Sequence, residues 1–193
     1  MKKGSGIIIV LAVLAVLVLW AVKSYNGLVS RDEAVSSAWS QVENMYQRRA
    51  DLIPNLVATV KGYAEHEQET FEAVVAARAK ATQVTVSDLS EESVQKFQQA
   101  QGEVSSALGR LLAVVENYPE LKANENFLDL QAQLEGTENR IAEARRSFNE
   151  TARTYNTQVR SFPANLIAGA FGFSTKGYFT ADESASQAPK VEF

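Results

Sequence analysis

The chain of 193 residues contains no cysteine and a single histidine, His66. The lack of cysteine excludes a disulfide framework, a thiol nucleophile and any zinc site built from thiolates. The single histidine excludes a metal site that needs two. Only four prolines and ten glycines interrupt the chain, so long stretches are free to be helical. The net charge of −4 argues against binding to nucleic acid through overall charge, and we expect no nucleic-acid partner.

Familiar catalytic motifs are also missing. The sequence has no phosphate-binding loop of the G-x-x-x-x-G-K-[ST] or G-x-G-x-x-G type and no G-x-S-x-G elbow. Glu65-His66-Glu67 is not a zincin motif, because the residue four positions after His66 is Thr70. We therefore expect a protein that is not an enzyme and has no cofactor. A hydrolase that uses His66 and carboxylates is the alternative hypothesis in which the chain is an enzyme.

The N-terminus carries a long apolar run. Residues 7–22 have no polar side chain, and with Gly4-Ser5-Gly6 they form a stretch of 19 residues. A helix of this length is roughly 28 Å long, which matches the hydrocarbon core of a bilayer. Residues 1–23 therefore predict a transmembrane anchor. The alternative is a cleaved signal peptide.

Basic residues lie on both sides of this run, with Lys2 and Lys3 before it and Lys23 and Arg31 after it. The positive-inside rule, applied to this small difference, favours a cytoplasmic N-terminus and a helical body outside. Residues 1–23 hold three lysines and no acidic residue, so the remaining body carries a net charge of −7.

The first half of the body contains two apolar stripes with helical spacing, one over residues 28–53 and one over residues 53–81. Between them, Asp51 is suited to cap a new helix and Pro54 to occupy its first turn. These residues predict a tight turn at 50–54. The alternative is a kink in one very long helix.

The second half contains two more stripes. After a predicted loop at 82–87, a helix begins at Ser87 or Asp88, with Glu91 placed for a capping box. Its apolar stripe advances in steps of three and four: Val94, Phe97, Gln101, Val104, Leu108, Leu111, Val115 and Tyr118. A last helix over about 124–161 repeats every seven residues: Phe127, Leu134, Ile141, Phe148, Tyr155 and Phe162.

Four helical segments with one stripe each predict an all-α protein. Its body, residues 24–173, is expected to be an antiparallel up-down four-helix bundle with coiled-coil-like packing. This connectivity places the 83–87 loop and residues 162–173 near the bilayer, and residues 50–54 and 117–123 at the far tip. Residues 174–193, rich in serine, alanine and acidic residues, predict a flexible tail.

Two groups of residues are candidates for contact with a partner or with the membrane. Arg48, Arg49 and Asp51 gather at the predicted distal turn, where they form either an interhelical ion pair or a docking site for a protein. Arg49 and Asp32 fall close to the apolar stripe and have to be paired or reach the rim. Residues 165–173 are apolar and either contact the membrane interface, cap the base of the body or meet another subunit; the candidates are Leu166, Ile167, Phe171 and Phe173.

Two long blocks resemble the LemA family. Residues 25–67, YNGLVSRDEAVSSAWSQVENMYQRRADLIPNLVATVKGYAEHE, are similar to its signature block, and residues 162–173, FPANLIAGAFGF, are similar to its C-terminal signature. The resemblance implies a bacterial inner-membrane or plasma-membrane protein with one span, an antiparallel four-helix body and no established enzyme activity. It also implies relatives linked with membrane proteases and, in one branch, with magnetosome membranes.

The expected function is that of a membrane-anchored scaffold or adaptor. Its expected partners are the lipid bilayer and other proteins, a membrane protease among the candidates, with a homo-oligomer as a further expectation. The alternative is an oligomeric protein that contacts or remodels lipid through residues 162–173.

Overall fold

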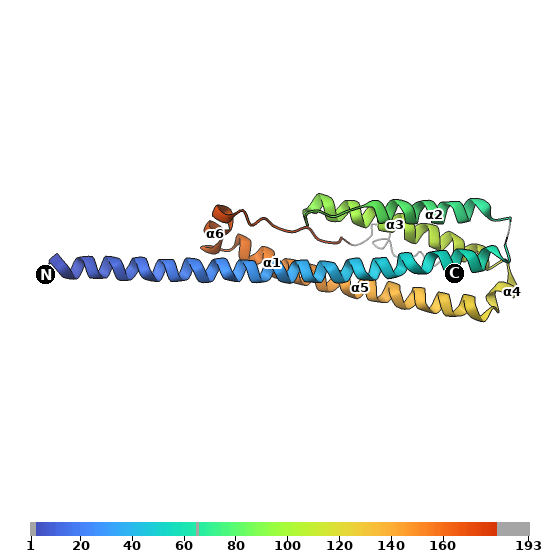
Figure 1. Cartoon of the computed structure of the whole chain (residues 1–193), viewed down its shortest axis with the longest axis horizontal. Coiled ribbons are helices and arrows are strands. Elements are labelled where there is room, and N and C mark those ends of the chain that lie inside the picture. Colours follow the sequence, from blue (N-terminus) through green and yellow to red (C-terminus); the bar gives the residue numbers. More distant parts are fainter. Residues whose placement is uncertain (1–2, 65, 181–193) are drawn as a thin grey trace, which may run out of the picture.

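A computed structural model describes residues 3–64 and 66–180, and the regular structure in these residues is entirely helical. The elements are α1 (Lys3–Lys61), α2 (Gln68–Gln83), α3 (Glu91–Val115), α4 (Pro119–Lys122), α5 (Glu125–Arg160) and α6 (Ala164–Phe171). Figure 1 shows α1 as one long rod, with α5 along its C-terminal half and α2 beside α3. The all-α prediction and the boundaries of the last long helix are confirmed.

The helices of the body differ in length. The second helix, α2, has 16 residues, whereas α3 has 25 and α5 has 36. The loop that joins α2 to α3 therefore lies farther from the N-terminus than α6 does (Figure 1). The predicted arrangement, in which the 83–87 loop and residues 162–173 lie at the same level, is wrong for this reason, since a helix of 16 residues is only about 24 Å long.

The predicted turn at 50–54 is also wrong, because α1 continues through Pro54 to Lys61. Proline has no N–H, so the carbonyl oxygen of Ala50, four residues earlier, has no donor within the helix. The Nε of Arg78 in α2 donates to this oxygen at 2.7 Å. One side chain from a neighbouring helix thus supplies the hydrogen bond that Pro54 removes, and the long-helix alternative is correct.

On the α1 side, the far tip is formed not by residues 50–54, as predicted, but by the connection between α1 and α2. The connection between α1 and α2 meets the segment around α4, where the Tyr118 hydroxyl lies 3.4 Å from Glu67 and the Asn124 Nδ2 donates to the Tyr63 hydroxyl at 2.9 Å. The 117–123 segment therefore lies at the far tip, as predicted, in contact with the connection that follows Lys61. Asn124 also caps α5, because its Oδ1 accepts the Phe127 N–H at 3.0 Å.

The interior consists of two apolar clusters. The cluster nearer the tip combines residues of α1, α2, α3 and α5, including Ile53, Phe71 and Leu111. The other centres on Trp39, whose ring lies 5.1 Å from Phe97 and 5.3 Å from Phe148 in edge-on contacts. The predicted stripes of α1, α3 and α5 supply most of both cores. Phe162 departs from its stripe and is 81% exposed, because α5 ends at Arg160 before the heptad is completed.

Part of the predicted flexible tail is packed against the body. Residues 174–180, which we call the strap, leave α6 and run back along the helices (Figure 1). Phe179 is 5% exposed and stacks on Trp39 with ring centroids 5.7 Å apart. The prediction is therefore wrong for the strap, because an aromatic side chain and several hydrogen bonds hold it. Residues 181–193 of the predicted tail lie outside the described residues.

The apolar run forms the first part of α1. Among the described residues, α1 alone is long and apolar enough to cross a membrane, with a mean hydropathy of 2.8 in its most apolar window and none of that window buried. No helical boundary separates this segment from the body. Such a segment satisfies its own backbone hydrogen bonds, which is the requirement for crossing lipid.

We predict that Arg78→Ala lowers the free energy of unfolding by about 1–2 kcal/mol, because the Ala50 carbonyl loses its donor. In a Pro54→Ala background the same change costs less than half of this, because the N–H of residue 54 then bonds to Ala50. Thermal unfolding of the detergent-solubilised chain, followed by circular dichroism, measures both effects.

The control is Lys80→Ala, which removes a solvent-exposed ion pair with Glu103 and is expected to change little. Equal costs of Arg78→Ala in the two backgrounds would show that Arg78 does not replace the missing helical bond.

Candidate functional site

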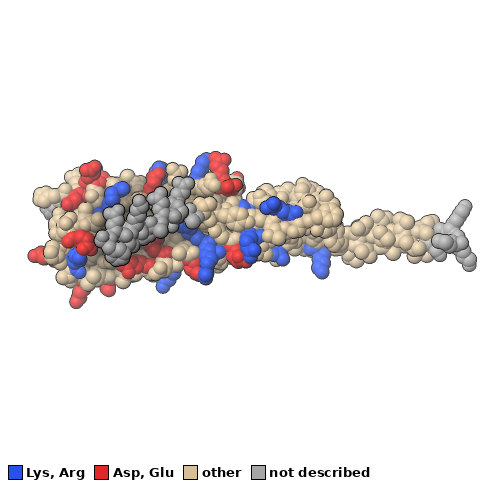
Figure 2. All heavy atoms as spheres, turned by 180° about the vertical axis from the view of Figure 1, so that it is seen from behind, with Lys and Arg blue, Asp and Glu red and all other residues tan. Residues whose placement is uncertain are grey.

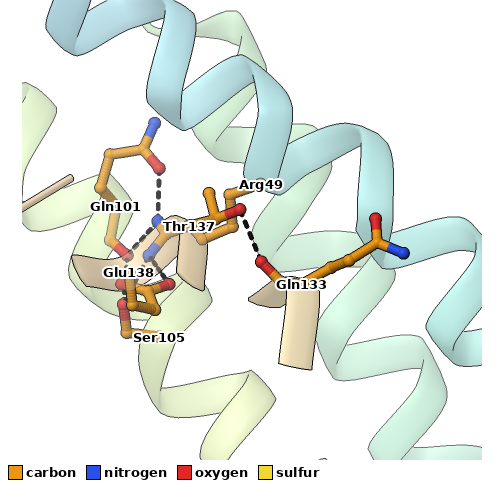
Figure 3. Close-up of polar contacts among 6 residues, drawn as sticks. All are labelled: Arg49, Gln101, Ser105, Gln133, Thr137 and Glu138. Carbon is orange, nitrogen blue, oxygen red and sulfur yellow. Dashed lines mark hydrogen bonds and ion pairs between the residues drawn. The ribbon is translucent and has the colours of Figure 1, made fainter. Parts of the chain in front are cut away.

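Arg49 is the most deeply buried charged residue among those described and joins three helices. It extends from α1, is 2% exposed, and reaches residues of α3 and α5 (Figure 3). Its Nη1 donates to Ser105 Oγ at 2.8 Å and to Glu138 Oε1 at 2.9 Å. Its Nη2 donates to the backbone oxygen of Gln101 at 3.0 Å and to Gln101 Oε1 at 2.6 Å. The planar fork of the guanidinium suits this arrangement, in which two nitrogens serve four acceptors.

The surroundings of Arg49 are shaped to receive it. Thr137 on α5 is fully buried beside it and donates its hydroxyl to the Gln133 carbonyl of its own helix at 2.7 Å (Figure 3). The Arg49 Cζ lies 5.0 Å from the centroid of the Tyr46 ring, within cation–π distance. Burial raises the pKa of the Tyr46 phenol, with Arg145 and Arg49 opposing the shift, so this phenol stays neutral at physiological pH.

The placement of the first predicted site group is corrected by these contacts. Arg49 does not lie at a distal turn, since α1 continues past it for twelve residues, and it forms the interhelical ion pair that was one of the two interpretations. Arg48 and Asp51 are exposed on α1, where the Asp51 carboxylate accepts a hydrogen bond from Gln47 at 2.7 Å. The structure therefore separates the three residues into one buried clamp and two surface charges.

A small hollow of about 140 Å³ opens beside Arg49 between α1, α2 and α3. Its polar lining includes Glu43, Gln47, Arg78 and Thr82. Within the described ranges, no group of three histidine, aspartate or glutamate side chains is placed to hold a metal ion. His66 lies exposed in the connection between α1 and α2, and Glu65 lies outside the described residues. The hollow is much smaller than a typical small-molecule site.

The second predicted site group lies on α6, beside the body end of the apolar run. Phe171 contacts Tyr25 of α1 with ring centroids 4.9 Å apart, and Phe173 contacts the same ring at 5.6 Å. Leu166 and Phe171 are 61% and 62% exposed, whereas Ile167 and Phe173 pack partly against the core. The group is therefore divided between a packing face and an exposed apolar face.

The surface around α6 differs from the rest of the body. Figure 2 shows acidic and basic side chains mixed over the body, whereas the part next to the apolar rod shows basic and uncharged residues on this face. An apolar helix face bordered by basic charge is typical of a surface that meets anionic headgroups. Residues 162–173 thus lie near the body end of the apolar run, as the predicted connectivity required.

The strap adds contacts that sequence reasoning missed. Lys176 Nζ lies 2.7 Å from Asp32 Oδ1 on α1 and 5.5 Å from the centroid of the Tyr155 ring. Burial, followed by the nearby Asp32 charge, raises the pKa of Tyr155 to about 12, so the phenol adds no second negative charge. Asp32 was expected to need a partner, but Lys176 was assigned to a flexible tail. The two aromatics in GYFT were the available signal that this segment packs.

We predict that Glu138→Ala destabilises the protein more than Arg49→Met does. Removing Glu138 leaves a buried cation without its counter-charge, for an expected loss of about 2–3 kcal/mol. Removing Arg49 leaves Glu138, which is 42% exposed and can be hydrated, for an expected loss of about 1 kcal/mol.

Chemical unfolding of the full chain in detergent measures this difference, with Arg48→Met as the exposed control. A larger loss for Arg49→Met than for Glu138→Ala would contradict an ion pair in which only the arginine is buried.

Comparison with known proteins assigns the chain to a family. The sequence pattern of the LemA family matches residues 38–193. Magnetosome protein MamQ 2 of Paramagnetospirillum magneticum is 28% identical over 202 residues, covering 92% of this chain and 74% of that protein, and MamQ of Magnetospirillum gryphiswaldense is similar to the same extent. Protein LemA of Metamycoplasma hominis is 23% identical over 158 residues, covering 82% of this chain and 69% of that protein. With most of its length matched by the family pattern, the chain belongs to the LemA family.

Proposed function

We propose that this chain is a single-pass, membrane-anchored scaffold or adaptor with no catalytic activity of its own. Its body works as an antiparallel four-helix bundle held against the membrane surface. Its N-terminus lies in the bacterial cytoplasm and the body on the other side of the inner membrane. It supports membrane protein quality control, with a membrane protease among its partners, or a membrane assembly.

The observation that carries this proposal is the continuity of α1. One helix of 59 residues begins in the apolar run and ends in the core of the body, with no linker between the two. A flexible linker would let the body sample many orientations, whereas a continuous helix fixes its height and direction above the bilayer. Fixed presentation of side chains is what a scaffold requires.

The surface offered to a protein partner includes Arg48 and Asp51. Both are exposed on α1 and lie beside the segment that carries the buried Arg49 clamp. Charged side chains on a rigid helix favour specific recognition and fast encounter more than raw affinity. The names of the MamQ relatives refer to the magnetosome, and this association supports a role in a membrane assembly.

The proposal predicts that the tagged full-length chain, crosslinked in intact cells, captures membrane proteins specifically. Reversing the two charges with Arg48→Glu and Asp51→Lys is expected to reduce this capture about tenfold or more. The matched control reverses Glu143 and Arg146, an exposed pair 2.8 Å apart on α5, and is expected to leave capture unchanged. Recovery of the wild-type chain as an isolated monomer would contradict the scaffold.

A second candidate function is supported by the exposed face of α6. Phe162, Leu166 and Phe171 are exposed beside the end of the span, and burial of such side chains in the interface stabilises membrane contact by up to about 1.5–3 kcal/mol each. In this alternative the chain is an oligomeric protein that contacts or remodels lipid through residues 162–173. It predicts that Leu166→Asp with Phe171→Asp, rather than the Arg48 and Asp51 reversal, abolishes the captured assembly.

A further inference from the structure

The strap is held by side-chain amides that bind its backbone. Asn156 accepts the Lys176 N–H and donates to the Lys176 carbonyl, both at 2.8 Å. Asn149 makes the same pair with Phe179, at 2.9 and 2.8 Å, and Gln98 makes it with Thr180, at 3.0 Å for each bond. Each amide therefore binds one residue as a neighbouring β-strand would, and this pattern accepts only an extended peptide.

Three further contacts select side chains rather than backbone. Phe179 fills an aromatic cage whose members are Trp39, Phe97 and Phe148, with Arg145 4.9 Å from the centroid of its ring. Lys176 meets Asp32. A Cβ on Gly177 would lie 2.6 Å from the Glu91 Cα, so only glycine fits there.

The groove between α1, α3 and α5 thus has the features of a peptide-recognition site. Backbone hydrogen bonds supply affinity in this mode of binding, and pockets for particular side chains supply specificity. Its chemistry selects an extended segment of the form Lys-Gly-x-Phe. This chain carries one such segment, residues 176–179, within the strap itself.

We propose that this groove also receives the strap of a second copy of the chain, so that neighbouring anchored copies are joined by exchange of their straps. The inference rests on the membrane-anchored scaffold proposed above and assigns the surface through which its copies meet. The strap follows Phe173, and the preceding Gly172 ends α6 with a φ of 78°, a value readily adopted only by glycine. The bonds made in exchange are the same as those broken, which makes swapping of identical elements energetically inexpensive.

Anchoring makes the encounter favourable. Because α1 is continuous from the apolar run to the groove residues Asp32 and Trp39, every copy presents its groove at the same height above the bilayer. Confinement to one plane and one height raises the effective concentration of a neighbouring strap. A soluble body on a flexible tether would have no such alignment.

The test uses full-length chains reconstituted together in lipid vesicles. The native chain has no cysteine, so one copy carries Glu91→Cys in the groove wall and a differently tagged copy carries Thr175→Cys in the strap. Both side chains are exposed, and neither takes part in the hydrogen bonds between the side-chain amides and the strap backbone. A short bis-maleimide joins the two thiols only when the strap of one copy occupies the groove of the other. Glu92→Cys, at the neighbouring exposed residue of α3, is the matched control.

Exchange predicts that bridged heterodimers exceed the Glu92→Cys control. Phe179→Ala on the groove copy releases its own strap and is expected to raise the yield several-fold, whereas the same change on the strap copy lowers it about tenfold, to the control level. If Phe179→Ala disturbs folding, Lys176→Glu replaces it, because it repels Asp32 without opening the aromatic cage. It is expected to raise the heterodimer yield on the groove copy and to lower it on the strap copy.

A chain carrying both Glu91→Cys and Thr175→Cys is expected to bridge internally, which shows that the groove is formed. The exchange would be overturned if this chain bridges internally but heterodimers are no more abundant than in the Glu92→Cys control. The comparison includes the groove copy whose own strap is released by Phe179→Ala. That result would leave the scaffold proposal standing, because capture of other membrane proteins through Arg48 and Asp51 does not depend on the strap.

Discussion

The helical hydrogen-bond ladder of α1 has to continue past Pro54, and the hydrogen bond from Arg78 to Ala50 is the contact that compensates for its one missing bond. Everything in the body depends on this continuity, because Ile53, Leu56 and Val60 enter the core only if the helix keeps its phase beyond the proline. A proline in a helix interior ordinarily costs about 3 kcal/mol, and a good part of that cost is the orphaned carbonyl. A long cationic side chain on the adjacent helix α2 reduces it.

Two charged residues of α1 are likewise paired with groups from other elements. Arg49 is surrounded by acceptors from α3 and α5, and Asp32 meets Lys176 from the strap. The buried Arg49 and the half-buried Asp32 are therefore each paired with an element distant in sequence, which ties the orientation of α1 to the rest of the body. A buried ion pair is weak evidence for net stability, and we assign to Arg49 the role of selecting one arrangement of the helices.

The sequence predicted the parts of the fold that follow from local periodicity. The stripes of α3 and α5 repeat in steps of three and four, and nearly all of their members are buried. The path of α1 could not be predicted, because the donor that rescues Ala50 lies 28 residues away in Arg78. The strap was missed for a related reason: its partners are amides at positions 98, 149 and 156, and nothing in their spacing reveals that they bind backbone. Among the candidate site residues, Arg49 was correctly expected to be paired, but its place in the fold required knowing where α1 ends.

The central claim is that α1 forms one continuous helix from the apolar run into the core, and a distance along it tests this most directly. Spin labels attached at Asn26→Cys and Ala58→Cys, two exposed positions 32 residues apart on α1, should lie roughly 48 Å apart in the reconstituted full-length chain, with a narrow distribution. Pulsed dipolar spectroscopy measures this separation. A turn at residues 50–54 would bring the second label back along the helix and shorten the distance by roughly 15 Å, and that result would contradict the continuous helix.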